Sequence, residues 1–198
     1  NGKNIFYKKG GYADLSDEAI WFIGGILKHG RALVAFTNPS TNSFKRLLPG
    51  FEAPVKLFYG LANRSAAIRI PKYTNTPDTK RFEFRTGDAT CNPYFAMSAL
   101  LLAGLDGIIN KIDPAKHKLG PYDDNVFAWS EKQKAKLLPI PANLAEAMES
   151  LEKDHDFLLQ GNVFNEELIE SHIKHKMAEH HAVMSRVHPH EMLLYYNL

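Results

Sequence analysis

Apolar and polar positions along this chain follow two different periods, and each period predicts a different kind of element. Helical spacing begins after Ser16, which can cap a helix running to about residue 29, and a short helix at 31–36 follows. Three later stretches have the β-branched and aromatic content and the alternation of strands. These predicted strands cover residues 55–61, 66–70 and 81–85. The middle of the chain is therefore expected to form a sheet.

Further helices are predicted on either side of a long polar loop. Asn92 and Pro93 open a helix that reaches about residue 105 and is apolar on nearly every side, so we expect it to be buried. Asn143 and Asn165 can each cap a later helix, ending near residues 154 and 181.

Composition limits the classes of protein that the chain can belong to. At 198 residues it can bury one sizeable core. A net charge of +2 gives no argument for nucleic acid, so we expect no nucleic-acid partner. We also expect no membrane partner, because no apolar run approaches the roughly 20 residues of a membrane helix. Cys91 is the only cysteine, which excludes an internal disulfide and fits a reducing cytoplasm.

The first residues have the character of a turn in mid-domain. Asn1-Gly2 commonly joins two hairpin strands, and here only the second candidate strand, Ile5-Phe6-Tyr7, is present. We expect a fragment that begins inside a domain; a flexible or processed terminus is the alternative.

Charge on the last predicted strand points to a binding site. In Arg81-Phe82-Glu83-Phe84-Arg85 the charged side chains share one face and the two phenylalanines share the other, core-facing one. Arginine forks suit phosphate and carboxylate oxygens. Five arginines fall within 40 residues, namely Arg46, Arg64, Arg69, Arg81 and Arg85. An anion site, with Glu83 as a candidate metal ligand, and surface ion pairs between strands are both consistent with this pattern.

Other candidate sites are weaker. His172 and His175 share a helix face with Glu179 and could bind a metal, but a solvated helix face is the favoured interpretation. Cys91 has no histidine nearby in the sequence, which argues against a nucleophile. No P-loop, dinucleotide fingerprint or zinc spacing occurs.

The end of the chain carries an unusual number of apolar side chains. After Pro189, which separates it from the preceding helix, come Met192, Leu193, Leu194, Tyr195, Tyr196 and Leu198. Such a segment is costly to leave in water, so it must pack on its own domain or on a neighbouring subunit.

Taken in order, these segments resemble the C-terminal portion of a bacterial class I glutamine synthetase, and the resemblance covers almost the whole chain. The matching residues are Thr37-Asn38-Pro39, Asn42 to Leu47, Pro49 to Pro54, Asn63 to Pro71, Arg81 to Arg85, Asn92-Pro93-Tyr94, Ala103 to Gly107, Asn110-Lys111 and His188 to Tyr196.

The resemblance implies a role for each matching charged residue. Arg46 and Arg85 correspond to arginines that hold glutamate, and Arg64 to the one on the transferred phosphoryl group. Arg69 and Arg81 correspond to arginines on the ATP phosphates, and Glu83 to a ligand of Mg²⁺ or Mn²⁺. Glu52 corresponds to a flap glutamate that helps to deprotonate ammonium.

It also implies the fold and the assembly. The expected fold is α+β: an incomplete antiparallel sheet, part of the catalytic barrel, is backed by helices over residues 1–186. Residues 187–198 would be an arm for contact between subunits, in an assembly of two stacked six-membered rings.

The implied activity is ATP-dependent ligation of ammonia to glutamate through γ-glutamyl phosphate, in the cytoplasm. Residues 1–198 alone are expected to be inactive, because they lack most metal ligands and half of each pocket. A γ-glutamyl ligase for a larger amine and a catalytically silent structural relative are the alternatives. One departure concerns regulation: Phe127 stands where many such enzymes carry a tyrosine that is adenylylated.

Overall fold

The structure is a computed structural model that describes residues 3–49, 53–74 and 76–196. Its elements are α1 (Asp17–Lys28), α2 (Gly30–Thr37), α3 (Ser43–Arg46), β1 (Tyr59–Leu61), β2 (Ile68–Ile70), β3 (Glu83–Phe84), α4 (Pro93–Ile109), α5 (Glu131–Lys134), α6 (Leu144–Lys153), α7 (Glu166–Met184) and α8 (Pro189–Tyr195), with 3₁₀ turns η1 (Tyr12–Asp14), η2 (Pro114–His117), η3 (Val126–Ala128) and η4 (Asp156–Asn162). An α+β fold is therefore confirmed.

The longer helices α1, α4, α6 and α7 begin where a side chain caps them. Ser16 Oγ accepts a hydrogen bond from Ala19 N at the start of α1. Asn92, Asn143 and Asn165 do the same for α4, α6 and α7. These starts are local in the sequence, so the predicted beginnings of the helices agree with the structure.

The sheet is small and open, as expected, but it is mixed rather than purely antiparallel. Within the described residues its order is β1-β2-β3; β1 runs parallel to β2, and β2 runs antiparallel to β3. A loop at 62–67, which starts with Ala62 at a positive φ of 55°, returns the chain so that β2 begins beside the start of β1. A hairpin turn would have given the antiparallel pair.

All three strands are shorter than predicted. The backbone before β1 and at its first residue forms hydrogen bonds with distant loops: Leu57 N donates to Leu138 O at 2.8 Å, and Tyr59 N donates to Leu119 O at 3.1 Å. Sequence patterns mark extended backbone, whereas strand length depends on which segments lie alongside it.

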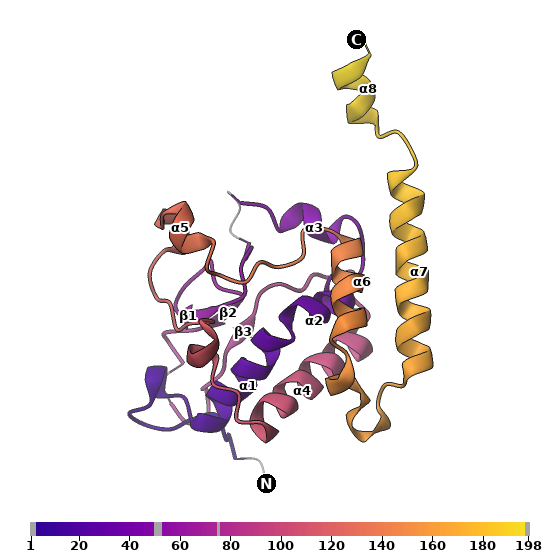
Figure 1. Cartoon of the computed structure of the whole chain (residues 1–198). Coiled ribbons are helices and arrows are strands. Elements are labelled where there is room, and N and C mark those ends of the chain that lie inside the picture. The colour runs from indigo at the N-terminus through magenta and orange to yellow at the C-terminus, as the bar shows by residue number, and fades with distance from the viewer. Residues whose placement is uncertain (1–2, 50–52, 75, 197–198) are drawn as a thin grey trace.

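The helices pack against one another and against one side of the sheet (Figure 1). α1 packs most extensively on α4, and α2 on α6. The α1–α4 crossing is close because Gly25 and Gly107 meet there: a Cβ on Gly25 would collide with Ala103 O, and one on Gly107 with Trp21 O. This layer supports the sheet from behind.

One expectation about α4 is wrong. The helix is apolar nearly all round, but one of its faces lies at the surface, where Met97 is 70% and Ile109 68% exposed, with Leu101 between them. α1 and α2 cover the opposite side. Apolar composition alone cannot tell how many faces of a helix have neighbours.

Of the two C-terminal helices, only α8 stands away from the body of the molecule (Figure 1). α7 lies along α6 and contacts the core through Ile169 and His172, whereas α8 stands beyond the end of α7 (Figure 1). The tail from Pro189 onwards is helical, with His188 as its cap.

In the described part of the chain, no single helix has both the length and the apolar character to cross a membrane. By length and composition alone one pair does, α1 with α2, and that pair is bent by 75°.

Candidate functional site

The candidate site is built on the charged face of the β2–β3 pair. Arg69 and Glu83 lie directly opposite each other in the register, and Arg69 Nη1 lies 2.8 Å from Glu83 Oε2. Phe82 and Phe84 point the other way and pack against the core, with Phe82 beside Phe6 and Phe22. The predicted alternation is confirmed for Glu83 and the two phenylalanines, and it separates a charged face from an apolar one.

Arg85 continues this face at the end of β3. Its backbone N donates to Ala67 O at 2.9 Å, and its guanidinium Nη1 donates to the backbone carbonyls of Arg64 and Ala66. Arg64 itself is exposed on the loop that precedes β2. The guanidinium of Arg85 therefore lies against the loop that carries Arg64.

Arg46 reaches the same region from α3. Its Nη2 donates to Thr86 O at 2.7 Å, to Gly87 O at 3.1 Å and to Arg85 O at 3.3 Å. Within the described residues, Nη1 and Nε of Arg46 form no hydrogen bond, and the side chain is exposed. One edge of this guanidinium is thus bound to backbone, and the other edge remains available to a ligand.

Arg81, one of the predicted site residues, stands apart. Arg81 is exposed and lies over the ring of Tyr73, 5.6 Å from its centroid, with Nη1 3.3 Å from Thr79 O, so its guanidinium does not join the Arg69–Glu83 pair. Glu52 lies outside the described residues. The structure brings together Arg46, Arg64, Arg69, Glu83 and Arg85.

The electrostatics of this region fit an anion. Arg69 Nε is buried and has no hydrogen-bond partner in the described residues, which is costly unless a ligand accepts from it. Arginine clusters of this kind bind phosphate and carboxylate oxygens.

A divalent metal is not accommodated by the described residues alone. Among them no group of three or more histidine, cysteine, aspartate or glutamate side chains comes together. Glu83 supplies one carboxylate, already paired with Arg69, so it fits one place in a ligand set and no more.

Two histidines on α7, His172 and His175, do not form a metal site with other described residues either. His172 is half-buried: its Nε2 is 3.1 Å from Ala35 O and its ring stacks on Phe36. Burial lowers the pKa of His172 below its ordinary value. His175 Nε2 instead lies 3.0 Å from Glu179. His172 thus anchors α7, and it is not part of the solvated helix face that we favoured.

Sequence reasoning missed a group of polar residues behind the arginines. Asn38 Nδ2 donates to Thr86 O at 2.8 Å, and Asp88 N donates to Thr37 O at 3.1 Å. Asp88 Oδ1 accepts from Thr90 N and Oγ1, a local turn that the Asp-x-Thr spacing could have indicated.

Asp88 is held in its charged form by its surroundings. Burial alone would raise the pKa of Asp88, but hydrogen bonds from Ser43 and Thr90 and the charge of Arg46 outweigh it, so the pKa lies below its ordinary value. A lasting negative charge next to Arg46 helps to fix that arginine in place.

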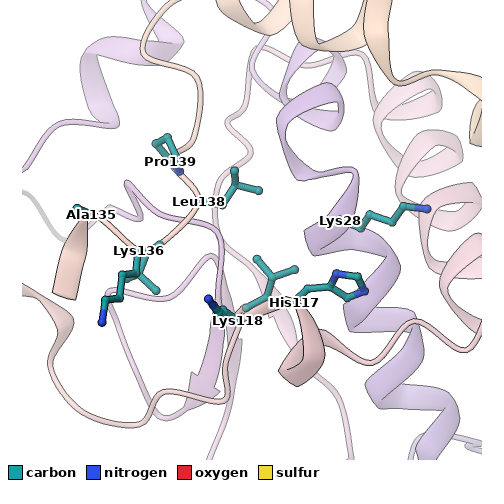
Figure 2. A pocket seen from close by; sticks show the side chains of 9 residues that line it. Lys28, His117, Lys118, Ala135, Lys136, Leu138 and Pro139 are labelled. Atoms are coloured by element: carbon teal, nitrogen blue, oxygen red, sulfur yellow. The ribbon is translucent and has the colours of Figure 1, made fainter. Parts of the chain in front are cut away.

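A separate cavity of about 440 Å³ lies between the end of α1, η2 and the segment at 135–139. Its floor is apolar, with Leu119 and Leu137, and its rim is basic. Figure 2 shows Lys28 pointing away from Lys118 and Lys136, so these cations do not converge on one point. Lys28 Nζ lies 3.5 Å from Asp106 Oδ2, so its charge is already paired. This cavity lacks the convergent charges of the arginine site.

Comparison with known proteins identifies close relatives. The glutamine synthetase of Streptomyces coelicolor is 51% identical over 198 residues, and that of Aquifex aeolicus is 48% identical. Each match covers 100% of this chain and 41% of the relative, so the chain spans about two fifths of their length.

Comparison with solved structures also finds a glutamine synthetase. A cryo-electron-microscopy structure of Plasmodium falciparum glutamine synthetase superposes with a TM-score of 0.82 at 36% identity, covering 99% of this chain and 45% of that one. A structure described as apo GmaS without ligand gives a TM-score of 0.75 at 30% identity, covering 98% and 41%.

The profile of one protein family, described as the catalytic domain of glutamine synthetase, matches residues 1–195. With the charged face of the sheet, the open α+β fold and relatives at about 50% identity along its whole length, this chain belongs to the glutamine synthetase family.

Proposed function

We propose that the complete protein containing this chain is a glutamate–ammonia ligase that makes glutamine at the expense of ATP. The terminal phosphoryl group of ATP passes to the side-chain carboxylate of glutamate, giving γ-glutamyl phosphate and ADP. Ammonia then attacks the carbonyl carbon, the bond to the phosphate oxygen breaks, and glutamine and phosphate leave. The observation that carries this proposal is the charged face of the sheet, where Arg69 pairs with Glu83 and Arg46 bonds the backbone next to Arg85, in a chain of this family.

The chemistry explains why arginines dominate the site. Negative charge spreads over the phosphoryl oxygens during transfer, and donors already in position stabilise it without reorganisation. We assign Arg64 to the transferred phosphoryl group and Arg46 with Arg85 to glutamate. The outer edge of Arg46 and the buried Nε of Arg69 provide donors for such anions.

The remaining assignments rest on the resemblance of this chain to its family. Arg69 and Arg81 bind the ATP phosphates, and Arg81 has to leave Tyr73 to do so. Glu83 provides one ligand of Mg²⁺ or Mn²⁺, and the other ligands come from outside the described residues. A bound divalent cation would neutralise phosphate charge. Glu52, also outside the described residues, is assigned to the flap and to the deprotonation of ammonium.

The proposed assembly is a homo-oligomer of two stacked six-membered rings, in which residues 187–198 form an arm to the opposite ring. α8 and its C-cap residue support this because their apolar side chains are exposed: Met192, Leu193, Leu194, Tyr195 and Tyr196. Leu198, also assigned to the arm, lies outside the described residues. We also propose a cytoplasmic location, which the single free Cys91 fits.

Substitution of Arg64 tests the assigned chemistry. In the complete enzyme, Arg64→Ala should lower kcat for glutamine formation by about 100-fold or more, while KM for ATP changes by less than about threefold. Arg31→Ala is the matched control, because Arg31 bonds Pro139 O on another part of the surface and should leave both constants near wild type. Equal effects on kcat and on ATP binding would remove the role proposed for Arg64. A panel of larger amines on the same enzyme distinguishes ammonia from other acceptors.

A further inference from the structure

The backbone at 85–88 is held in place by a buried asparagine at the end of α2. Asn38 is fully buried, and its Nδ2 donates to Thr86 O at 2.8 Å. Its Oδ1 accepts from Thr37 Oγ1 at 2.8 Å. Because Thr37 occupies the oxygen of the amide, the nitrogen has to face Thr86.

The Thr86 carbonyl has a second donor, and that donor belongs to the candidate site. Arg46 Nη2 lies 2.7 Å from the same oxygen, so one carbonyl joins the buried asparagine to the exposed guanidinium. A carbonyl oxygen has two lone pairs and can accept both bonds. The position of Arg46 therefore depends on a backbone group whose orientation Asn38 fixes.

Arg85 depends on the same backbone. It directly precedes Thr86, and its own carbonyl also accepts from Arg46. On the far side the segment is fixed again, since Asp88 N donates to Thr37 O at 3.1 Å. Thr37, the last residue of α2, and Asn38, the residue at its C-cap, thus hold the segment that carries Arg85 and receives Arg46.

We propose that Asn38 is a positioning residue for the arginine pair Arg46 and Arg85, and so for the anion that the two bind. Asn38 touches neither substrate nor cofactor. It acts by holding the Thr86 carbonyl at the place where Arg46 bonds to it. That the anion is the carboxylate of glutamate rests on the proposed function; the positioning itself does not.

The test is a comparison of Michaelis constants in the complete enzyme. Asn38→Ala should raise KM for glutamate by about tenfold, the effect of one well-placed hydrogen bond, and change kcat and KM for ATP by less than about threefold. Thr37→Val keeps the shape and removes only the bond that orients the amide, so a rise of about threefold is expected. Thr37→Val also tests the proposal if Asn38→Ala fails to fold.

Two further measurements distinguish a positioning role of Asn38 from a simple loss of stability. Asn143→Ala removes a helix-capping asparagine far from the 85–88 segment in the sequence and should leave KM for glutamate unchanged. Hydrogen exchange of the amides at 86–88 should quicken in Asn38→Ala and in Thr37→Val, and stay slow in Asn143→Ala.

Each outcome decides the question. The proposal would be overturned if KM for glutamate stayed unchanged in both Asn38→Ala and Thr37→Val. It would also be overturned if kcat and both KM values worsened in parallel, as in an equally destabilised control. If the wild-type enzyme makes no glutamine, the proposed function fails, and the exchange rates at 86–88 still decide whether Asn38 holds the segment.

Discussion

Arg69 and Glu83 form an ion pair across the β2–β3 strand pair, with Nη1 and Oε2 2.8 Å apart and the two side chains 23% and 33% exposed. Glu83→Gln leaves the half-buried guanidinium without its counter-ion, so the free energy of unfolding should fall by about 1 kcal/mol. Urea unfolding of variant and wild type measures this. The pair Glu131–Lys134 is the control, because Glu131 is 90% exposed and Glu131→Gln should change almost nothing. An unchanged free energy of unfolding in Glu83→Gln would show that the sheet pair adds no stability.

His172 makes the docking of α7 sensitive to acid. Burial lowers the pKa of His172 below its ordinary value of 6.5, while the hydrogen bond to Ala35 O only partly opposes this. Below about pH 6.5 the unfolded chain takes up a proton that the folded chain resists, so stability falls as the pH falls towards the folded pKa.

The charged neighbours of His172 are Lys176, His175 and Glu179 on its own helix. His172→Gln cannot titrate and should lose less stability between pH 7.5 and pH 5.5 than the wild type. For a single proton the difference is at most about 1.4 kcal/mol per pH unit. Urea unfolding at both pH values checks this, and an identical pH dependence in the two proteins would contradict it.

Phe127 removes the acceptor for adenylylation on the 119–136 loop. It is partly exposed in η3 but has no hydroxyl, while the hydroxyl of the nearby Tyr122 donates to Lys118 O at 3.1 Å. Complete enzyme incubated with an adenylyltransferase and ATP should therefore carry no AMP on this loop by mass spectrometry. Phe127→Tyr is the matched variant and should gain the adduct. An adduct on the unaltered loop would refute this prediction.

The apolar side chains of α8 should hold the two rings together. Tyr196 is 84% exposed, and Leu193 76%. Burying each large side chain contributes roughly 1.5–3 kcal/mol, less the cost of ordering the segment. Deletion of residues 189–198 from the complete protein should separate the rings and leave the subunits folded, as light scattering and circular dichroism would show. An intact double ring after the deletion would mean that other contacts join the rings.

A feature of the fold or of the candidate site could be predicted from the sequence when the interactions that cause it lie within a few residues. The caps at Ser16, Asn143 and Asn165 act within three residues, so the starts of α1, α6 and α7 follow from the sequence. The opposite faces of Glu83 and Phe84 follow from the pleat of a strand.

The rest depends on distant partners. The parallel pairing of β1 with β2 and the exposed face of α4 both depend on what packs beside each element. The bond from Asn38 to Thr86 spans 48 residues of sequence, and no spacing rule points to it. Tyr73, which holds Arg81 away from the pair, is likewise visible only in three dimensions.

The most direct test of the proposed chemistry follows the oxygen of the γ-carboxylate. The complete enzyme is given glutamate labelled with ¹⁸O in that carboxylate, together with ATP and ammonium, and the released phosphate is analysed by mass spectrometry. If the reaction passes through γ-glutamyl phosphate, each glutamine formed leaves one labelled oxygen in the phosphate, and replacing ammonium with a larger amine slows the turnover. Glutamine formed with unlabelled phosphate, or no glutamine at all, would contradict the account.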